Sequence, residues 1–95
     1  MKVHELKCWP EPFEAARKGV KRYEVRVDDG RGFAVGDFLK LLEWDPLYEG
    51  PPQYVDHDPK YTGRMLEVFV THLSRGPEWG LPSGMVVMSI EELPF

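Results

Sequence analysis

The sequence predicts an α+β domain built on a small closed β-barrel of about five to six strands, with one short helix near the N-terminus. Five stretches show the alternation or apolar density of strands, and only one shows the end signals of a helix. The chain has 95 residues, of which 42% are hydrophobic and 13% aromatic, enough for one modest core. We therefore expect residues 1–95 to form a single domain.

The N-terminal part predicts a strand followed directly by the helix. Residues 3–9 (VHELKCW) alternate as a strand does, and Pro10 and Pro12 end the alternation. Pro12 suits the first position of a helix, because its fixed φ and missing N–H cost nothing there. We expect the helix over Pro12–Lys18, with Gly19 as its C-terminal cap.

Four further strands are expected, separated by turn signals rich in glycine, proline and aspartate. Their predicted bounds are Lys21–Val27, Phe38–Trp44, Arg64–Leu73 and Met85–Ile90. The second of these, FLKLLEW, has apolar residues on both faces, which is typical of a central or barrel strand. Residues 45–62 contain four prolines and predict an enlarged loop, which is uncommon in so small a domain and therefore a candidate for function.

The charge is unevenly distributed along an acidic chain. The formal net charge is −4, which excludes a molecule that attracts nucleic acid with its whole surface. Residues 1–31 hold eight basic and six acidic residues, whereas the remainder holds four basic and ten acidic residues. A local basic patch in the N-terminal third is therefore compatible with the composition.

Neither a membrane nor a secretory pathway is indicated. No apolar run approaches the ~20 residues that span a bilayer, and the N-terminus lacks the apolar core of a signal peptide. The single cysteine, Cys8, has no partner for an internal disulfide, and we expect it to be a small buried apolar residue. We expect a cytoplasmic protein.

No metal or cofactor is expected. Asp56, His57 and Asp58 are adjacent in the predicted loop, but consecutive loop residues rarely converge on one ion, and His72 is distant. The chain contains no phosphate-binding loop and no dinucleotide fingerprint.

The strand after the helix carries an unusual amount of charge. In GVKRYEVR, strand alternation places Lys21 on one face and Glu24 and Arg26 on the other, unless Gly19 allows a distortion that re-aims Lys21. A lysine–glutamate pair offers both a donor and an acceptor, as an amide or a nucleobase edge requires. The alternative is a structural ion pair at the mouth of the barrel.

Aromatic and basic residues elsewhere add to this candidate site. Trp9 and Trp44 can stack on a base, an interaction of about 1–3 kcal/mol, or serve as core and rim aromatics of the barrel. Lys7 adds positive charge for a phosphate if it faces the site. We expect His4 to be a packed residue bonded to the backbone.

Several motifs together resemble a known family. HELKCWPEPFEAARKGVKRYEVR, FAVGDFLKLLEWD, YTGR and WGLPSGMVVMSI are similar to a small bacterial and phage family of ASCH-type domains (DUF3850-like) within the PUA-like superfold. The resemblance covers nearly the whole chain except residues 47–60. It implies that the helix lies across one opening of the barrel, and that a ligand cleft lined by the following strand lies between them.

The resemblance also implies functions. Domains of this kind are commonly RNA-binding, and some are amidohydrolases acting on N4-acylated cytidine through a K-x-x-T strand motif and a distant glutamate. Lys21 matches the lysine, but Glu24 stands where the threonine would be, and Glu67 and Glu78 are the candidates for the distant acid.

We therefore expect, first, a module that binds RNA or a nucleotide by recognising a base in the cleft. The expected ligand-binding residues are Lys7, Trp9, Lys21, Glu24, Arg26 and Trp44. One alternative is an amidohydrolase of acylated nucleosides in which Lys21 and Glu24 are catalytic. The other is an interaction protein that presents the 45–62 loop to a protein partner.

Overall fold

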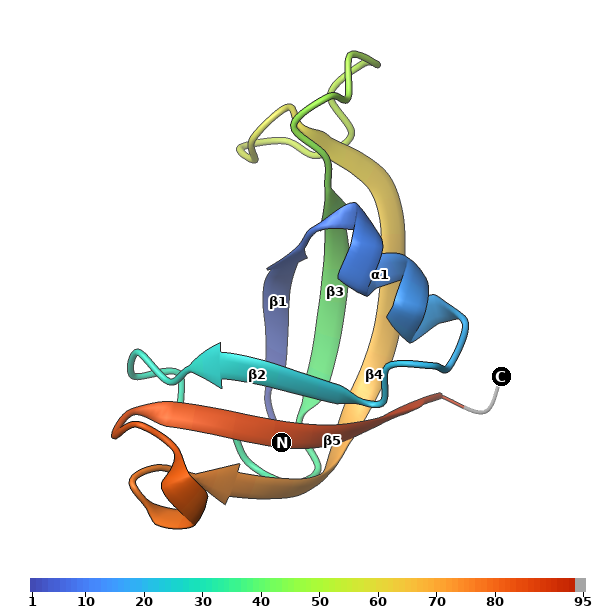
Figure 1. The fold of residues 1–95 in the computed structure, drawn as a ribbon. Helices are drawn as coiled ribbons and strands as arrows, with labels where there is room; N and C mark the ends of the chain where they lie inside the picture. Colours follow the sequence, from blue (N-terminus) through green and yellow to red (C-terminus); the bar gives the residue numbers. More distant parts are fainter. Residues whose placement is uncertain (94–95) are drawn as a thin grey trace.

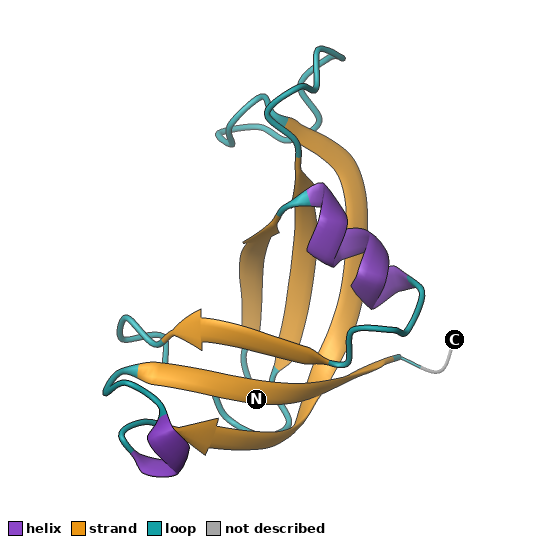
Figure 2. Ribbon diagram, viewed as in Figure 1, coloured by secondary structure: helices purple, strands orange, loops and turns teal. Residues whose placement is uncertain are grey.

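Residues 1–93, which the computed structural model describes, form an α+β domain with one curled five-stranded sheet and one α-helix (Figures 1 and 2). The sheet is a half-barrel, and the predicted α+β class is confirmed. In chain order the elements are β1 (Val3–Cys8), α1 (Pro10–Arg17), β2 (Tyr23–Val27), β3 (Phe38–Trp44), β4 (Tyr61–Arg75), the short 3₁₀ helix η1 (Glu78–Gly80) and β5 (Met85–Glu92).

The curl of the sheet is produced by its longest strand. The strand order is β1-β3-β4-β5-β2, with β1 parallel to β3 and every other neighbouring pair antiparallel. The first part of β4 pairs with β3, and its second part pairs with β5. The β4–β5 register shifts between Val70 and His72, an irregularity that bends a strand. β1 and β3 therefore form one wall, and β5 and β2 form the other (Figure 1).

The sequence predicted a closed barrel, whereas the observed barrel is open on one side. β1 and β2 are the two edges of the sheet, and no ladder joins them within residues 1–93. Two arginine side chains bridge this opening instead. Arg26 Nη2 donates to the carbonyl oxygen of Lys7 at 3.0 Å, and Arg31 Nη1 donates to that of Glu5 at 2.9 Å. We call the opening between β1 and β2, bridged by these arginines, the seam.

The core fills the inside of the half-barrel. α1 lies on the concave side against β3 and contributes Phe13 and Ala16 (Figure 1). Cys8 is a free thiol buried among these residues, as expected. The other buried members come from β1, the loop after β2, β3, β4 and β5: Leu6, Phe33, Leu39, Leu41, Leu66, Val68, Val70, Val86, Met88 and Ile90.

The helix begins two residues earlier than predicted. Trp9 is the extended N-cap, and its carbonyl oxygen accepts the first helical bond from the N–H of Phe13 at 2.9 Å. Both prolines fit within the first turn, because the N–H groups there have no partner inside the helix. Pro10, not Pro12, is therefore the first helical residue. Gly19 follows the helix with φ +75°, a conformation that glycine adopts without strain.

All five predicted strands are present, but the bounds of four of them differ from the prediction. β3 has the predicted bounds, whereas β1 ends one residue early and β2 begins two residues late. β4 extends beyond its prediction at both ends, so the enlarged loop shortens to residues 45–60, and β5 continues to Glu92. Sequence alternation fades at these ends, where β4 and β5 reach past the core and none of the added residues is buried.

The turn before β3 is anchored by a buried histidine–aspartate pair. His4 Nε2 lies 2.8 Å from Asp37 Oδ2, and both residues are buried. His4 is thus packed as expected, but its partner is a carboxylate, not the backbone. Burial tends to raise the pKa of Asp37, but hydrogen bonds from His4 and from the backbone N–H groups of Lys2 and Ala34 lower it below its ordinary value.

Candidate functional site

A cleft opens where the end of β1, the start of α1 and β2 meet. Its volume is about 270 Å³. Five of the six side chains expected to bind a ligand line it: Lys7, Trp9, Lys21, Glu24 and Arg26. The sixth, Trp44, is not among its lining residues. Residues that are distant in sequence therefore share one concave site next to the seam.

The backbone before β2 brings the charged residues of this segment together. Glu24 points into the half-barrel and is 3% exposed, while its neighbour Tyr23 points outward and is half exposed. Lys21 precedes the strand, and its N–H donates to the carbonyl oxygen of Ala15 at 3.0 Å. Together with the positive φ of Gly19, this contact redirects the chain, so the Lys21 ammonium reaches the inner face.

Glu24 is held between two cations. Lys21 Nζ donates to Oε1 at 2.6 Å, and Arg26 Nε donates to Oε2 at 3.1 Å. The Lys21 ammonium also donates to the carbonyl oxygen of Tyr23 at 2.7 Å, while Arg26 reaches across to Lys7. An ammonium has three donors and a guanidinium five, so both cations keep free donors, and each carboxylate oxygen keeps a lone pair. This cluster carries a net positive charge and can both donate and accept.

The two tryptophans have different environments. Their ring centroids lie 5.0 Å apart at an interplanar angle of 60°, and the Lys7 ammonium sits 3.8 Å from the centroid of Trp44. Trp44 is therefore covered by Trp9 and Lys7. Trp9 lines the cleft and is 52% exposed, so its ring is available to a ligand.

Cys8 lies at the floor of the cleft, but it is not arranged as a nucleophile. Burial, followed by the negative charge of Glu24, raises the pKa of the thiol to about 11, against the lowering effect of Lys21 and Arg26. The thiolate is the reactive form, so at neutral pH this cysteine stays protonated.

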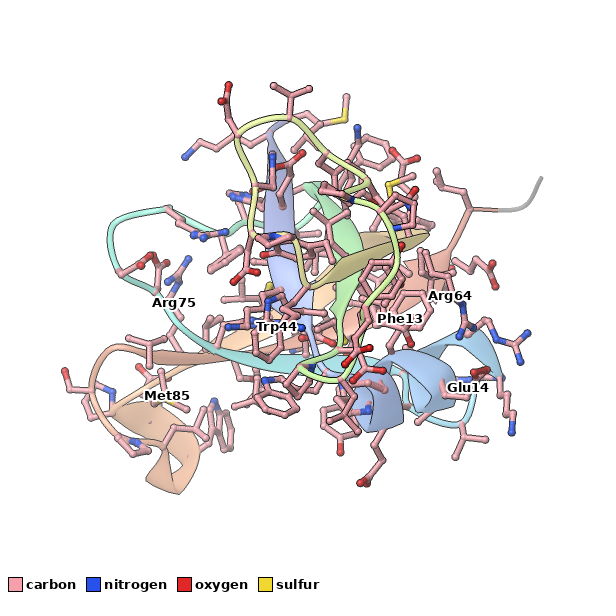
Figure 3. The ribbon with its side chains drawn as sticks, turned by 90° about the horizontal axis from the view of Figure 1, so that it is seen from above. Phe13, Glu14, Trp44, Arg64, Arg75 and Met85 are labelled. Atoms are coloured by element: carbon pink, nitrogen blue, oxygen red, sulfur yellow. The ribbon has the colours of Figure 1, made fainter. Side chains whose placement is uncertain are left out.

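A second buried carboxylate, Glu43, was not found from the sequence. It is 6% exposed and stands opposite Cys8 in the β1–β3 register. Thr62 Oγ1 donates to it at 2.8 Å, and Arg64 Nη1 lies 3.4 Å from its Oε2. Arg64 also pairs with Glu14 of α1 at 3.2 Å, and Figure 3 labels both residues. The sequence did contain a signal for its burial, because strand alternation in FLKLLEW places residue 43 on the same face as the inward residues Leu39 and Leu41.

The two glutamates that the resemblance suggested for a distant acid lie elsewhere. Glu67 is on β4 between the inward residues Leu66 and Val68, and Glu78 is exposed in η1. Neither lines the cleft.

The described residues form neither a metal-binding cluster nor a membrane-spanning helix. Within residues 1–93, no three histidine, cysteine, aspartate or glutamate side chains converge as a possible metal site. In the same part of the chain, no helix combines the length and apolar character needed to cross a bilayer.

Comparison with known proteins identifies a family. A family model described as a domain of unknown function, DUF3850, matches residues 3–90, which include all five strands up to Ile90 and the whole cleft. No curated protein matches the chain. The match spans most of the 95 residues, and the chain therefore belongs to the DUF3850 family of domains of unknown function.

Proposed function

We propose that the half-barrel and its helix form a PUA-like domain of the ASCH type, and that the protein is an RNA- or nucleotide-binding module. In this proposal the cleft recognises a single unstacked base. The observation that carries it is the buried Glu24 carboxylate between Lys21 and Arg26, directly beside the exposed ring of Trp9.

The chemistry of the cleft supports a base as its ligand. A nucleobase presents a flat π-face and an edge that carries donors and acceptors. Trp9 offers an aromatic face, and the cluster around Glu24 offers both kinds of polar partner. The volume of about 270 Å³ equals about nine waters at about 30 Å³ each, which is enough for one pyrimidine ring.

An amide-shift NMR titration tests the proposal. Cytidine, N4-acetylcytidine and a short single-stranded RNA are added separately, and we expect shifts centred on residues 19–26 and Trp9. Trp9→Ala should weaken binding about tenfold, which corresponds to about 1.4 kcal/mol of lost stacking. Lys21→Ala should also weaken it, whereas Lys18→Ala, an exposed lysine outside the cleft, should not. If none of the three ligands shifts the cleft residues, the proposal is wrong.

A second function is favoured by the 2.6 Å contact between Lys21 and Glu24 inside the cleft. In hydrolysis of an N4-acylated cytidine, Glu24 would take a proton from the attacking water and return it to the leaving amine. The Lys21 ammonium would stabilise the developing oxyanion. Acetate release from N4-acetylcytidine tests this, and Glu24→Gln should abolish release. If N4-acetylcytidine binds but no acetate is released, the hydrolase function is wrong and only the binding function remains.

A further inference from the structure

Basic side chains continue from the cleft along the whole seam. Arg26 and Arg31 are anchored to carbonyl oxygens of Lys7 and Glu5, two residues apart on β1. Two strand residues span about 6.6 Å. This is close to the spacing of successive phosphates in an extended single strand of nucleic acid.

The row of cations ends in a second, shallow hollow. Its volume is about 830 Å³, and its charged lining residues are Lys2, Glu5, Arg31 and Lys40. Lys2 Nζ donates to the backbone carbonyl oxygen of Arg31 at 3.0 Å, which ties this ammonium to the loop that carries Arg31. Arg31 lines the hollow and Arg26 lines the cleft, so the two arginine bridges of the seam connect them, and we call the cations of the hollow, the seam and the cleft the track.

The track differs in charge from the rest of the molecule. It holds six cations, and five carboxylates accompany them: Glu5, Glu24, Asp29, which lies 3.6 Å from Arg31, Glu67, which stands opposite Lys40 on β4, and Asp58, which lies near Lys7. The local balance is therefore +1, and the rest of a chain of formal charge −4 carries −5. The six cations are Lys2, Lys7, Lys21, Arg26, Arg31 and Lys40.

The opposite side of Lys21 is less suited to a polyanion. A hollow of about 280 Å³ lies there, beneath the end of α1 and beside the end of β5. Glu91 and Glu92 line it together with Lys21 and Arg22, so its charges cancel. A chain of phosphates that leaves the cleft therefore gains no net attraction on this side, whereas the cations of the seam attract it.

We propose that a single-stranded RNA lies along the seam, with successive phosphates on Arg26, Arg31 and Lys2 and with one base in the cleft. The inference rests on the proposed base-binding function. It makes the ligand a polynucleotide, because a free nucleoside fills only the cleft and leaves the remaining donors of the seam cations unused.

The test compares two double variants that remove the same charge. Lys2→Gln with Arg31→Gln alters the seam, and Arg17→Gln with Lys18→Gln alters the exposed end of α1 away from the track. Binding of a labelled short RNA is measured by fluorescence anisotropy at several salt concentrations, and cytidine binding is measured by NMR. A single variant, Lys40→Gln, covers the case in which the seam pair fails to fold, because the described residues show no ion pair or hydrogen bond for the Lys40 side chain.

The seam variant should bind RNA more weakly, and the slope of log affinity against log salt should fall by about 1.4 for two lost phosphate contacts. Its affinity for cytidine should stay unchanged, and the α1 variant should behave as the wild type. Equal loss of RNA affinity in both double variants, or no loss in the seam variant and in Lys40→Gln, overturns the inference. Absence of any cytidine or RNA binding by the wild type overturns the proposed function itself.

Discussion

Replacing Asp28 by asparagine tests how the turn that carries Arg31 is held. Asp28 Oδ2 accepts a hydrogen bond from Arg75 Nη1 at 2.8 Å, while Oδ1 accepts bonds from the N–H groups of Gly30 and Gly32 at 3.3 and 3.0 Å. These contacts, the bond from Arg75 above all, lower the pKa of Asp28 from 3.8 to about 2. Asparagine keeps the Oδ1 acceptor, but it removes the charge and puts an NH2 donor in place of the Oδ2 acceptor that faces Arg75.

The magnitude follows from that shift. A change of about 1.8 pKa units corresponds to at most about 2.4 kcal/mol of folding free energy at neutral pH. The Asp28 side chain is 12% exposed, but that of Arg75 is 46% exposed, so solvent screening reduces the expected loss to about 1 kcal/mol.

The pH dependence gives the sharper test. The folded pKa lies below the unfolded one, so the stabilisation is complete above 3.8 and is lost as the pH falls through about 2. Urea unfolding of both proteins should therefore show a difference at neutral pH that shrinks over this window. A difference that is already absent at neutral pH, or that stays constant down to pH about 2, would refute the reasoning. Asp29→Asn, whose side chain is 67% exposed, should change stability by less than about 0.5 kcal/mol.

Four other substitutions test the cleft, a loop and the buried pair before β3. Glu24→Gln removes a charge that raises the pKa of Cys8, so thiolate absorbance should appear below the wild-type pKa of about 11, and an unchanged titration would contradict this. Gly76→Ala places a Cβ 1.8 Å from a backbone carbonyl oxygen and should cost about 3 kcal/mol. Gly80→Ala, with positive φ but open space, should cost about 1 kcal/mol, and equal losses in urea unfolding would refute the clash. Asp37→Ala strips a buried imidazole of its partner and should cost about 3 kcal/mol in the same assay, whereas a neutral effect would show that water replaces the carboxylate.

Local patterns predicted the elements well, because their signals lie within a few residues. FLKLLEW predicted β3 with its observed bounds, whereas the C-cap is Lys18 and the predicted cap residue Gly19 follows it with positive φ. The start of the helix was misplaced because Pro10 and Pro12 are equally compatible with a first turn. The strand order was not predicted, because the pairing of β1 with β3 and of β2 with β5 depends on the whole core.

The cleft was predicted in composition but not in geometry. Strand alternation places Lys21 on the face opposite to Glu24. Only the contact of its N–H with Ala15 and the turn at Gly19 bring the Lys21 side chain to Glu24. Trp44 has the right chemistry, but its ring is covered by Trp9 and Lys7, which no sequence pattern indicates.

The pairing of β2 with β5 determines when the cleft can exist during synthesis. Tyr23 stands opposite Ser89, so 66 residues of chain separate two partners that lie side by side in the sheet. Contacts between such distant segments slow folding, because the long loop must close before any of them forms. On the ribosome, β1, α1 and β3 emerge long before β5, and β2 has no partner strand until then. β2 therefore takes its place in the wall of the cleft only after β5 has left the exit tunnel, and a chain cut before β5 would carry the residues of the cleft without its shape.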